Sequence, residues 1–453
     1  MIFSDLVEMN SNNIPMYNSY PPLPHWNTGL ISKSSWYQSL DHHLRKNRGI
    51  SIYIHLPFCE KLCAYCGCNQ RTTSNQHAEQ SYVDTIIAEW NTLLNNLVIT
   101  PIIREIHLGG GSPTCFSPKE LTRMLKGIIN HQMVVPTANM GFEAHPSTTR
   151  FDHLISLRDF GFDRVSLGIQ DISSVVLKAN NQEQIKEQIE KVTFYARALG
   201  YKSVNYNLIY GIPFQSADHM HSTMDYVTKL RPDRIALYSY EYVPWKSRGQ
   251  RAFTENDFLK SNDKYLLREI ADQKLLANGY INIGMDHYAL PHDDLAQVKI
   301  QRNLHRDFMG YSIHHNAVTL GLGSSAFSST PDMFIQNHKS VEEYQQCVNN
   351  NIWPVSQGHI LSAEDRMVKT AIHELMTMER LVYKKGSALD RLIQSRKSVW
   401  NQWVADGLCI MEDEKIIVTP KGALFIRQIY STLDPNIQCE QNQRSASAKQ
   451  YVE

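Results

Sequence analysis

Four of the eight cysteines fall within ten residues, at Cys59, Cys63, Cys66 and Cys68. The first three have the spacing C-x3-C-x2-C. Three thiolates placed in this way can bind a cubane of four irons and leave the fourth iron without a protein ligand, open to chemistry. A structural zinc site would normally take four ligands from two separated pairs, and a disulfide framework would scatter its cysteines along a short secreted chain. The spacing therefore predicts a [4Fe-4S] cluster bound by Cys59, Cys63 and Cys66.

The elements that must position this loop follow an alternating pattern. Short β-branched runs alternate with helical patterns about six times, which predicts a parallel sheet. The predicted strands cover residues 51–56, 105–108, 139–143, 164–169, 203–209 and 234–238. Six units indicate an incomplete barrel, although an open doubly wound sheet has the same periodicity. We expect an α/β fold built on a partial, six-unit βα barrel.

Chemically unusual residues sit where these strands end. The cysteine loop follows the first strand, and the run Gly109-Gly110-Gly111-Ser112 follows the second. The others are Glu143 at the end of the third strand, Gln170 after the fourth, Asn207 in the fifth and Glu241 after the sixth. The carboxyl ends of parallel strands converge on one face, where such folds place active sites. The sequence therefore predicts a single site at this face.

Charge and composition limit the classes of partner that the protein is expected to bind. Forty-five basic residues balance forty-five acidic ones, so neither nucleic acid nor an anionic membrane is expected as the main partner. The first residues lack a signal-peptide pattern, and no apolar run is long enough to span a membrane. Clustered free thiols also fit a reducing compartment. We expect a cytoplasmic protein, active as a monomer on a small substrate.

The chain divides into four expected parts. Residues 1–48 form a leader over the active site, 49–340 the barrel, 341–434 a small helical domain and 435–453 a polar, disordered tail. Within the third part, two or three helices precede a hairpin pattern at 408–418, an order that resembles a winged-helix module. A DNA-binding role for this module and a purely structural one both remain open, and the neutral charge of the chain favours the second.

The cysteine spacing resembles the signature of radical S-adenosylmethionine (SAM) enzymes. In that superfamily SAM chelates the open iron through its amino and carboxylate groups. One electron from the cluster then cleaves SAM, and the resulting 5′-deoxyadenosyl radical abstracts hydrogen. The resemblance implies SAM as the second cofactor of this protein.

Beyond this motif, residues 17–434 resemble the oxygen-independent coproporphyrinogen III oxidase family. The segments that carry the resemblance are Tyr53–Cys59, Cys63–Asn69, Gly109–Thr114, Gly168–Asp171, Leu208–Pro213, Gly284–Tyr288 and Leu304–Tyr311. The family implies a partial radical SAM barrel with a helical C-terminal domain. It also implies oxidative decarboxylation of two propionates of coproporphyrinogen III to vinyls in haem biosynthesis, with an electron donor such as flavodoxin or ferredoxin.

The resemblance also implies roles for individual residues. Cys59, Cys63 and Cys66 ligate the cluster, whereas Cys68 is an extra cysteine beside it and, with Tyr53, a candidate catalytic residue. Two SAM molecules lie side by side. The first is lined by Tyr53, Gly110, Glu143 and Phe327. The second is held by Tyr65, Gly111, Ser112, Gln170, Gln182, Asn207 and Glu241.

Some of these positions depart from the family pattern. The family usually has arginine where Gln182 stands, aspartate at Asn207, alanine at Glu241 and arginine at Met16. Neutral amides bind a zwitterion less strongly than charged groups do, so affinity for the second SAM is expected to be reduced. The departures leave two alternatives open, a radical SAM paralogue that acts on another tetrapyrrole and a haem chaperone. The Gly67-Cys68-Asn69 tail and the long leader favour an enzyme over the haem chaperone.

Overall fold

The structure is a computed structural model that describes residues 20–26, 31–73, 75–129, 133–182, 184–243 and 249–436. Most of the expected tail at 435–453 and the first part of the expected leader lie outside the described residues. Within the leader, the described elements are a short turn, η1 (Leu23–His25), and the helix α2 (Lys33–Lys46). None of the described helices is long and apolar enough to cross a membrane.

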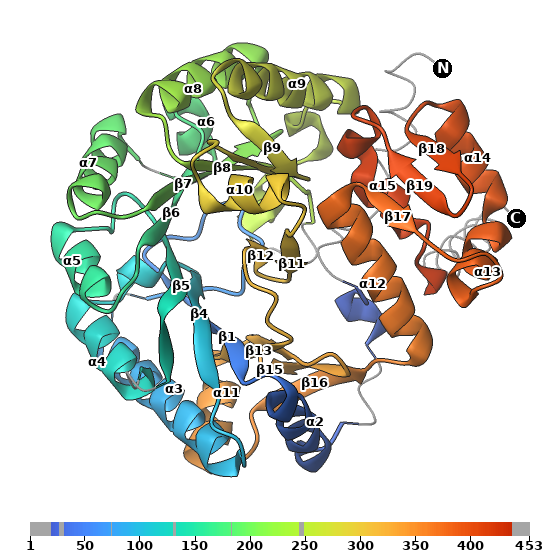
Figure 1. Ribbon diagram of the computed structural model, residues 1–453. Helices are drawn as coiled ribbons and strands as arrows, with labels where there is room; N and C mark the ends of the chain where they lie inside the picture. The colour runs from blue at the N-terminus through green and yellow to red at the C-terminus, as the bar shows by residue number, and fades with distance from the viewer. Residues whose placement is uncertain are drawn as a thin grey trace, which may run out of the picture.

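Six parallel strands form the centre of a curved sheet (Figure 1). They are β1 (Gly49–Leu56), β4 (Ile102–Gly110), β5 (Val134–Ala144), β6 (Arg164–Gln170), β7 (Ser203–Tyr210) and β8 (Arg234–Ser239). All six predicted strands are present, each one to five residues longer at one or both ends. Their order in the sheet follows the chain without reversal, whereas a doubly wound sheet reverses at a switch point. The expected partial barrel is therefore confirmed.

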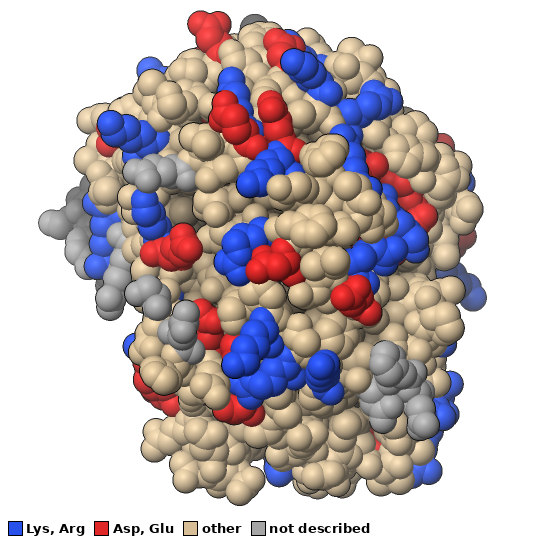
Figure 2. Space-filling view, turned by 90° about the vertical axis from the view of Figure 1, so that its left-hand side faces the viewer, with Lys and Arg blue, Asp and Glu red and all other residues tan. Residues whose placement is uncertain are grey.

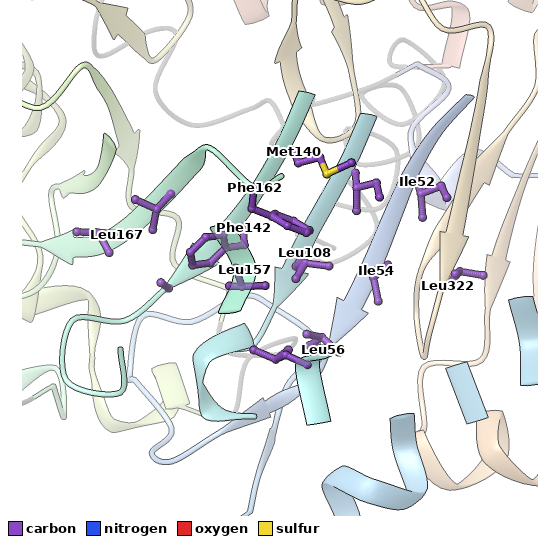
Figure 3. Close-up of a cluster of buried hydrophobic side chains, with 14 of the residues drawn as sticks. Ile52, Ile54, Leu56, Leu108, Met140, Phe142, Leu157, Phe162, Leu167 and Leu322 are labelled. Carbon is purple, nitrogen blue, oxygen red and sulfur yellow. The ribbon is translucent and has the colours of Figure 1, made fainter. Parts of the chain in front are cut away.

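Helices cover the outer side of this sheet (Figure 1). They are α3 (Gln76–Asn96), α4 (Pro118–Ile128), α5 (Phe151–Asp159), α6 (Ser174–Ala179), α7 (Lys186–Ala198), α8 (Ala217–Leu230) and α9 (Ser261–Ala277). Side chains such as Ile52, Leu108 and Phe142 point from the strands toward the helices and are fully or almost fully buried (Figure 3). The face of this helical layer in Figure 2 carries basic and acidic side chains interspersed. The buried apolar side chains between the strands and the helices fix the positions of the strands and hence of the loops at their carboxyl ends.

Short strands extend the sheet at both edges, and the sequence patterns did not identify them. Beyond β1 lie β13 (Val318–Leu322), β14 (Phe327–Ser329), β15 (Met333–Asn337) and β16 (Val355–Ile360), and beyond β8 lie β10 (His287–Ala289) and β9 (Ile281–Gly284). Only β13 is parallel to its neighbour β1; the others are antiparallel. The helix α11 (Val341–Asn349) connects β15 to β16. The large sheet thus continues past residue 340.

A small hairpin lies in the open side of the curved sheet. Its strands are β11 (His305–Asp307) and β12 (Gly310–Ser312), which follow α10 (Asp294–Ile300). Figure 1 shows this hairpin between the sheet and the C-terminal helices. The hairpin therefore closes part of the space that an incomplete barrel leaves open.

The C-terminal region combines helices with a three-stranded sheet. Its elements are α12 (Ala363–Met378), β17 (Arg380–Val382), α13 (Ala388–Ser395), α14 (Lys397–Ala405), β18 (Cys409–Glu412), β19 (Lys415–Val418) and α15 (Ile426–Ser431). The predicted hairpin is β18–β19, and β17 adds to it on the β19 side. Asp286 of the barrel side binds both Arg268 and Arg427, so a buried ion-pair cluster joins this region to the barrel.

Candidate active site

The cysteine loop is closed at its base by backbone hydrogen bonds. The two-residue strands β2 (Phe58–Cys59) and β3 (Arg71–Thr72) pair in parallel. The Arg71 amide donates to the Pro57 carbonyl at 2.8 Å, and the Thr73 amide donates to the Cys59 carbonyl at 3.1 Å. The cysteines therefore lie on a loop whose two ends are held together beside the carboxyl end of β1.

None of the four cysteines of this loop forms a disulfide. Cys59, Cys63 and Cys66 are half-buried, and Cys68 is exposed. Burial raises the pKa of the Cys59 and Cys63 thiols, and the neighbouring Cys68 thiol raises both further. A bound metal ion reverses this effect, because it stabilises the thiolate directly. Without the cluster the Cys59 and Cys63 thiols are protonated at neutral pH, because their pKa values are raised.

The thiols do not form a site for a single metal ion. Among the described residues, no three His, Cys, Asp or Glu side chains are close enough to hold one ion. A cubane has a different requirement, because each of its cysteines binds a separate iron. Three cysteines outside any disulfide, on one closed loop, therefore fit the cluster rather than a mononuclear metal.

The glycine run brings the loop after β4 against the cysteine loop. A Cβ on Gly111 would lie 2.8 Å from Cys59 Sγ and 2.7 Å from the Phe58 carbonyl oxygen. Gly110 has a φ of 118°, a backbone conformation that residues other than glycine rarely adopt. The Gly111 amide also donates to the Leu56 carbonyl at 2.9 Å. Only glycine permits this approach, so the two loops form one continuous surface around Cys59.

Three of the four residues expected around the first SAM lie close together. The Gly110 amide donates to the Glu143 carboxylate at 3.2 Å, and a Cβ on Gly109 would touch both Tyr53 and Glu143. The fourth, Phe327, is connected to Tyr53 through Phe308, whose ring centroid is 5.6 Å from that of Tyr53 and 5.7 Å from that of Phe327. Sequence reasoning did not single out Phe308, although it lies within a segment that carries the family resemblance.

The expected second SAM site contains amides that already have partners. Tyr65 donates to Gln182 Oε1, and Gln182 Nε2 is 3.1 Å from His145 Nε2. Gln182 is only 3% exposed. Asn207 Oδ1 accepts hydrogen bonds from Asn205 at 2.8 Å and Ser166 at 3.2 Å. A ligand that needs the Gln182 amide or the Asn207 Oδ1 atom must therefore displace a hydrogen bond within the protein.

The remaining residues of that set are only partly brought together. Gln170, at a φ of 61°, lies against Tyr65 at the end of β6. The Ser112 amide donates to the Phe58 carbonyl at 3.0 Å, beside the cysteine loop. The Glu241 carboxylate instead faces Lys264, whose pKa burial lowers to about 8. Glu241 partly offsets that lowering, which is a role the sequence did not predict.

A cavity lined mainly by polar side chains occupies the barrel interior next to Glu143 and Asn207. Other residues that line it include His107, Asn139, Arg164, Asn205, Arg234, Tyr238, His287, Asp307 and Tyr311. None of these nine was predicted as a site residue. Three of them, His287, Asp307 and Tyr311, fall within the segments that carry the family resemblance, which is the signal that could have identified them.

Asp307 has the most perturbed carboxyl group of this cavity. Burial, and then the nearby Glu105, raise its pKa from 3.8 to about 7. Between about pH 4 and pH 7 the folded protein therefore holds a proton that the unfolded chain has lost, and stability falls as the pH rises through this window. We expect Asp307→Asn to increase the free energy of unfolding at pH 8 by about 1–3 kcal/mol, with little change at pH 4.

Urea unfolding of both proteins at pH 4, 6 and 8 measures this difference. Asp413→Asn, at an exposed aspartate of the β18–β19 turn, is the matched control and should leave stability unchanged at every pH. An Asp307→Asn variant with the same pH profile as the unaltered protein would show that Asp307 is ionised at neutral pH.

Comparisons with known proteins were made for the whole chain. The sequence profile of the radical SAM superfamily matches residues 53–227. The oxygen-independent coproporphyrinogen III oxidase of Pseudomonas aeruginosa is 30% identical over 439 residues, which cover 95% of each chain. The enzyme of the same name from Escherichia coli is 31% identical over 440 residues, covering 95% of this chain and 94% of the relative.

A solved structure gives the same result. Coproporphyrinogen III oxidase from Escherichia coli, described as a radical SAM enzyme, superposes with a TM-score of 0.87 at 30% identity. The match covers 93% of this chain and 97% of the other. It therefore includes the C-terminal region as well as the barrel.

Proposed function

Because the chain belongs to the oxygen-independent coproporphyrinogen III oxidase family, we propose that it is a radical SAM oxidoreductase of haem biosynthesis that decarboxylates coproporphyrinogen III. Two propionate side chains of the substrate become vinyl groups. Each conversion removes one hydrogen atom from the β-carbon, one molecule of carbon dioxide and one electron. The observation that carries the proposal is the contact between the glycine run and Cys59, together with the hydrogen bond from the Gly110 amide to Glu143, which lines the cavity.

The residues of the site have different roles in this reaction. Cys59, Cys63 and Cys66 hold the [4Fe-4S] cluster, and the cluster and SAM, when bound, supply the radical that removes the hydrogen atom. Glu143 offers a carboxylate to the SAM amino group, at the point where it accepts the Gly110 amide. Tyr53 and Cys68 lie beside the cluster and are the candidate catalytic residues. Burial raises the pKa of the Tyr53 hydroxyl well above its usual value, which keeps it protonated as a hydrogen-bond donor.

We further propose that the protein works as a monomer in the cytoplasm, where a reducing environment keeps the loop thiols available. A flavodoxin or ferredoxin would supply the electron for SAM cleavage. Neither nucleic acid nor a membrane takes part in this scheme.

Two SAM molecules per site are part of the proposal, the first beside Tyr53, Gly110, Glu143 and Phe327. The second would lie beside Tyr65, Gly111, Ser112 and Gln170, and would be bound more weakly. Gln182 and Asn207 are neutral, and their amides are engaged with His145, Tyr65, Ser166 and Asn205. Binding of the second SAM must therefore displace hydrogen bonds within the protein, and the neutral amides offer its charged groups no ion pair.

Gln182→Arg is expected to tighten binding of the second SAM by about tenfold, because a guanidinium can hold a carboxylate through two charge-assisted hydrogen bonds. Anaerobic equilibrium dialysis of the reconstituted protein with labelled SAM measures both binding steps. Val175→Arg adds the same charge at a residue of α6 that is 63% exposed, and it should change neither step. A Gln182→Arg variant with an unchanged second step would refute the placement of this residue at the second SAM.

Anaerobic incubation of the reduced, reconstituted protein with SAM and coproporphyrinogen III tests the proposed function. Mass spectrometry should detect 5′-deoxyadenosine and a tetrapyrrole that has lost two carboxyl groups. SAM cleavage with unaltered coproporphyrinogen would point to a paralogue with another tetrapyrrole substrate. Stoichiometric haem binding without SAM cleavage would point to a chaperone.

A further inference from the structure

Unpaired polar atoms gather around the barrel cavity. Four residues that line it, Asn139, Arg164, Arg234 and His287, each have a buried side-chain nitrogen or oxygen without a hydrogen-bond partner among the described residues. Arg306, beside the lining residues Asp307 and Tyr311, has two such atoms, Nε and Nη1. Leaving a buried donor unpaired costs about 1–3 kcal/mol, so native proteins rarely keep several in one place without a ligand or water to satisfy them.

Arg306 differs from the other arginines around this cavity. Arg164 pairs with Asp294 at 2.6 Å and Arg234 with Asp293 at 2.8 Å. Arg268 and Arg427 share Asp286, which lies between them. Across the part of the chain that the structure describes, Arg306 makes no ion pair with any carboxylate. Among these arginines, Arg306 is therefore the one whose guanidinium can still pair with an anion.

The position of Arg306 is fixed by aromatic neighbours at the cavity wall. It lies opposite Tyr311 in the β11–β12 hairpin, and its guanidinium carbon is 4.6 Å from the centroid of that ring. The Tyr311 ring packs on His287 at 5.3 Å, and His287 packs on Tyr238 at 5.9 Å. All three rings line the cavity. A planar guanidinium held on a ring in this way presents its remaining donors as a preorganised fork.

His287 adds a second unpaired group to this wall. Its Nδ1 atom is buried without a partner among the described residues. Burial, and then the neighbouring Arg306, lower the pKa of the imidazole ring more than Asp286 raises it, so His287 is neutral and can offer one N–H. Arg306 and His287 together supply donors, and within the described residues neither makes an ion pair with the nearby carboxylates of Asp286 and Asp307.

We propose that Arg306, supported by His287, binds one carboxylate of the substrate and thereby orients the tetrapyrrole in the cavity. This inference rests on the proposed function, because coproporphyrinogen III carries four propionates and a buried unpaired guanidinium matches a carboxylate. Arg306 is a positioning residue. The β11–β12 hairpin that carries Arg306 lies beside α12 of the C-terminal region, where His373 accepts the Arg306 amide (Figure 1).

The test compares a charged and an uncharged form of one ligand. Anaerobic ultrafiltration measures binding of coproporphyrinogen III and of its tetramethyl ester to the reconstituted full-length protein. We expect Arg306→Met to weaken binding of the tetracarboxylate by about 10- to 100-fold and to leave binding of the ester unchanged. Arg306→Lys should recover part of the affinity, since it keeps the charge and loses the fork. KM should rise more than kcat falls.

Arg302→Met is the matched control, because it removes the same charge from an exposed position just before the hairpin. A misfolded variant would lose the ester as well as the acid, so the ester distinguishes loss of the site from loss of the fold. If Arg306→Met binds the acid as well as the unaltered protein does, the assignment fails while the proposed function stands. If the unaltered protein binds no coproporphyrinogen at all, both fail.

Discussion

Replacement of Cys59, Cys63 or Cys66 by alanine is expected to abolish the iron–sulfur cluster and, with it, all SAM cleavage. The three thiols lie on one loop that backbone hydrogen bonds close at its base. A three-cysteine site has no spare protein ligand, because the fourth iron is the one left for SAM. Loss of one thiolate therefore cannot be compensated within the motif.

Iron and sulfide analysis, the visible absorption of the reconstituted protein and 5′-deoxyadenosine formation measure this effect together. Cys115→Ala is the matched control, because Cys115 lies near Cys59 and is outside the motif. Cys68→Ala should also keep a full cluster, since Cys68 is exposed and is not an expected ligand. Normal SAM cleavage by any of the three ligand variants would overturn the ligand assignment.

The sequence predicted the parallel strands well because each is a buried run with a helix after it. In β4, residues such as Ile103, Ile106 and Leu108 face the apolar core, and this burial produces the β-branched pattern that identifies a strand. The positions of Glu143 and the glycine run followed from the same pattern. The carboxyl end of a parallel strand is a fixed place in this fold, so a residue near that end is brought to the site.

The residues of the cavity wall could not be predicted from the sequence, for a physical reason. Strands such as β10 and β11 have three residues each, too few to show a period. Arg306 and His287 come together only through the order of the sheet, which places β10 next to β8, and through packing of the hairpin against β10. Their unpaired atoms are a property of the folded state, and no local pattern encodes them.

The C-terminal region was also predicted only in part. The hairpin pattern at 408–418 identified β18 and β19, but its third strand, β17, has three residues and was not predicted. Docking of the region depends on Asp286, which is buried between Arg268 and Arg427. His373 of α12 accepts the Arg306 amide at 3.3 Å, so this region also supports the hairpin that carries Arg306. The C-terminal region thereby contributes to the shape of the active-site cavity.

Gly111→Ala is expected to lower cluster content and to reduce SAM cleavage by about 100-fold, since a displacement near 1 Å at a reacting centre can cost that much in rate. The new Cβ would lie 2.7 Å from the Phe58 carbonyl oxygen, 2.8 Å from the Pro57 carbonyl oxygen and 2.8 Å from Cys59 Sγ. Two of these three atoms belong to the backbone, so they cannot move away as a flexible side chain could. Either the cysteine loop or the loop after β4 must shift.

Gly67→Ala is the matched control for this substitution. Gly67 lies in the same cysteine loop, between Cys66 and Cys68, and a Cβ built there meets no atom within 4 Å. It should keep its cluster and its activity, whereas Gly111→Ala should lose both and fall in stability by about 1–3 kcal/mol. Iron analysis and thermal unfolding of the two variants side by side measure the difference. Equal iron content in both would mean that the contact between Gly111 and Cys59 does not hold the cluster loop in place.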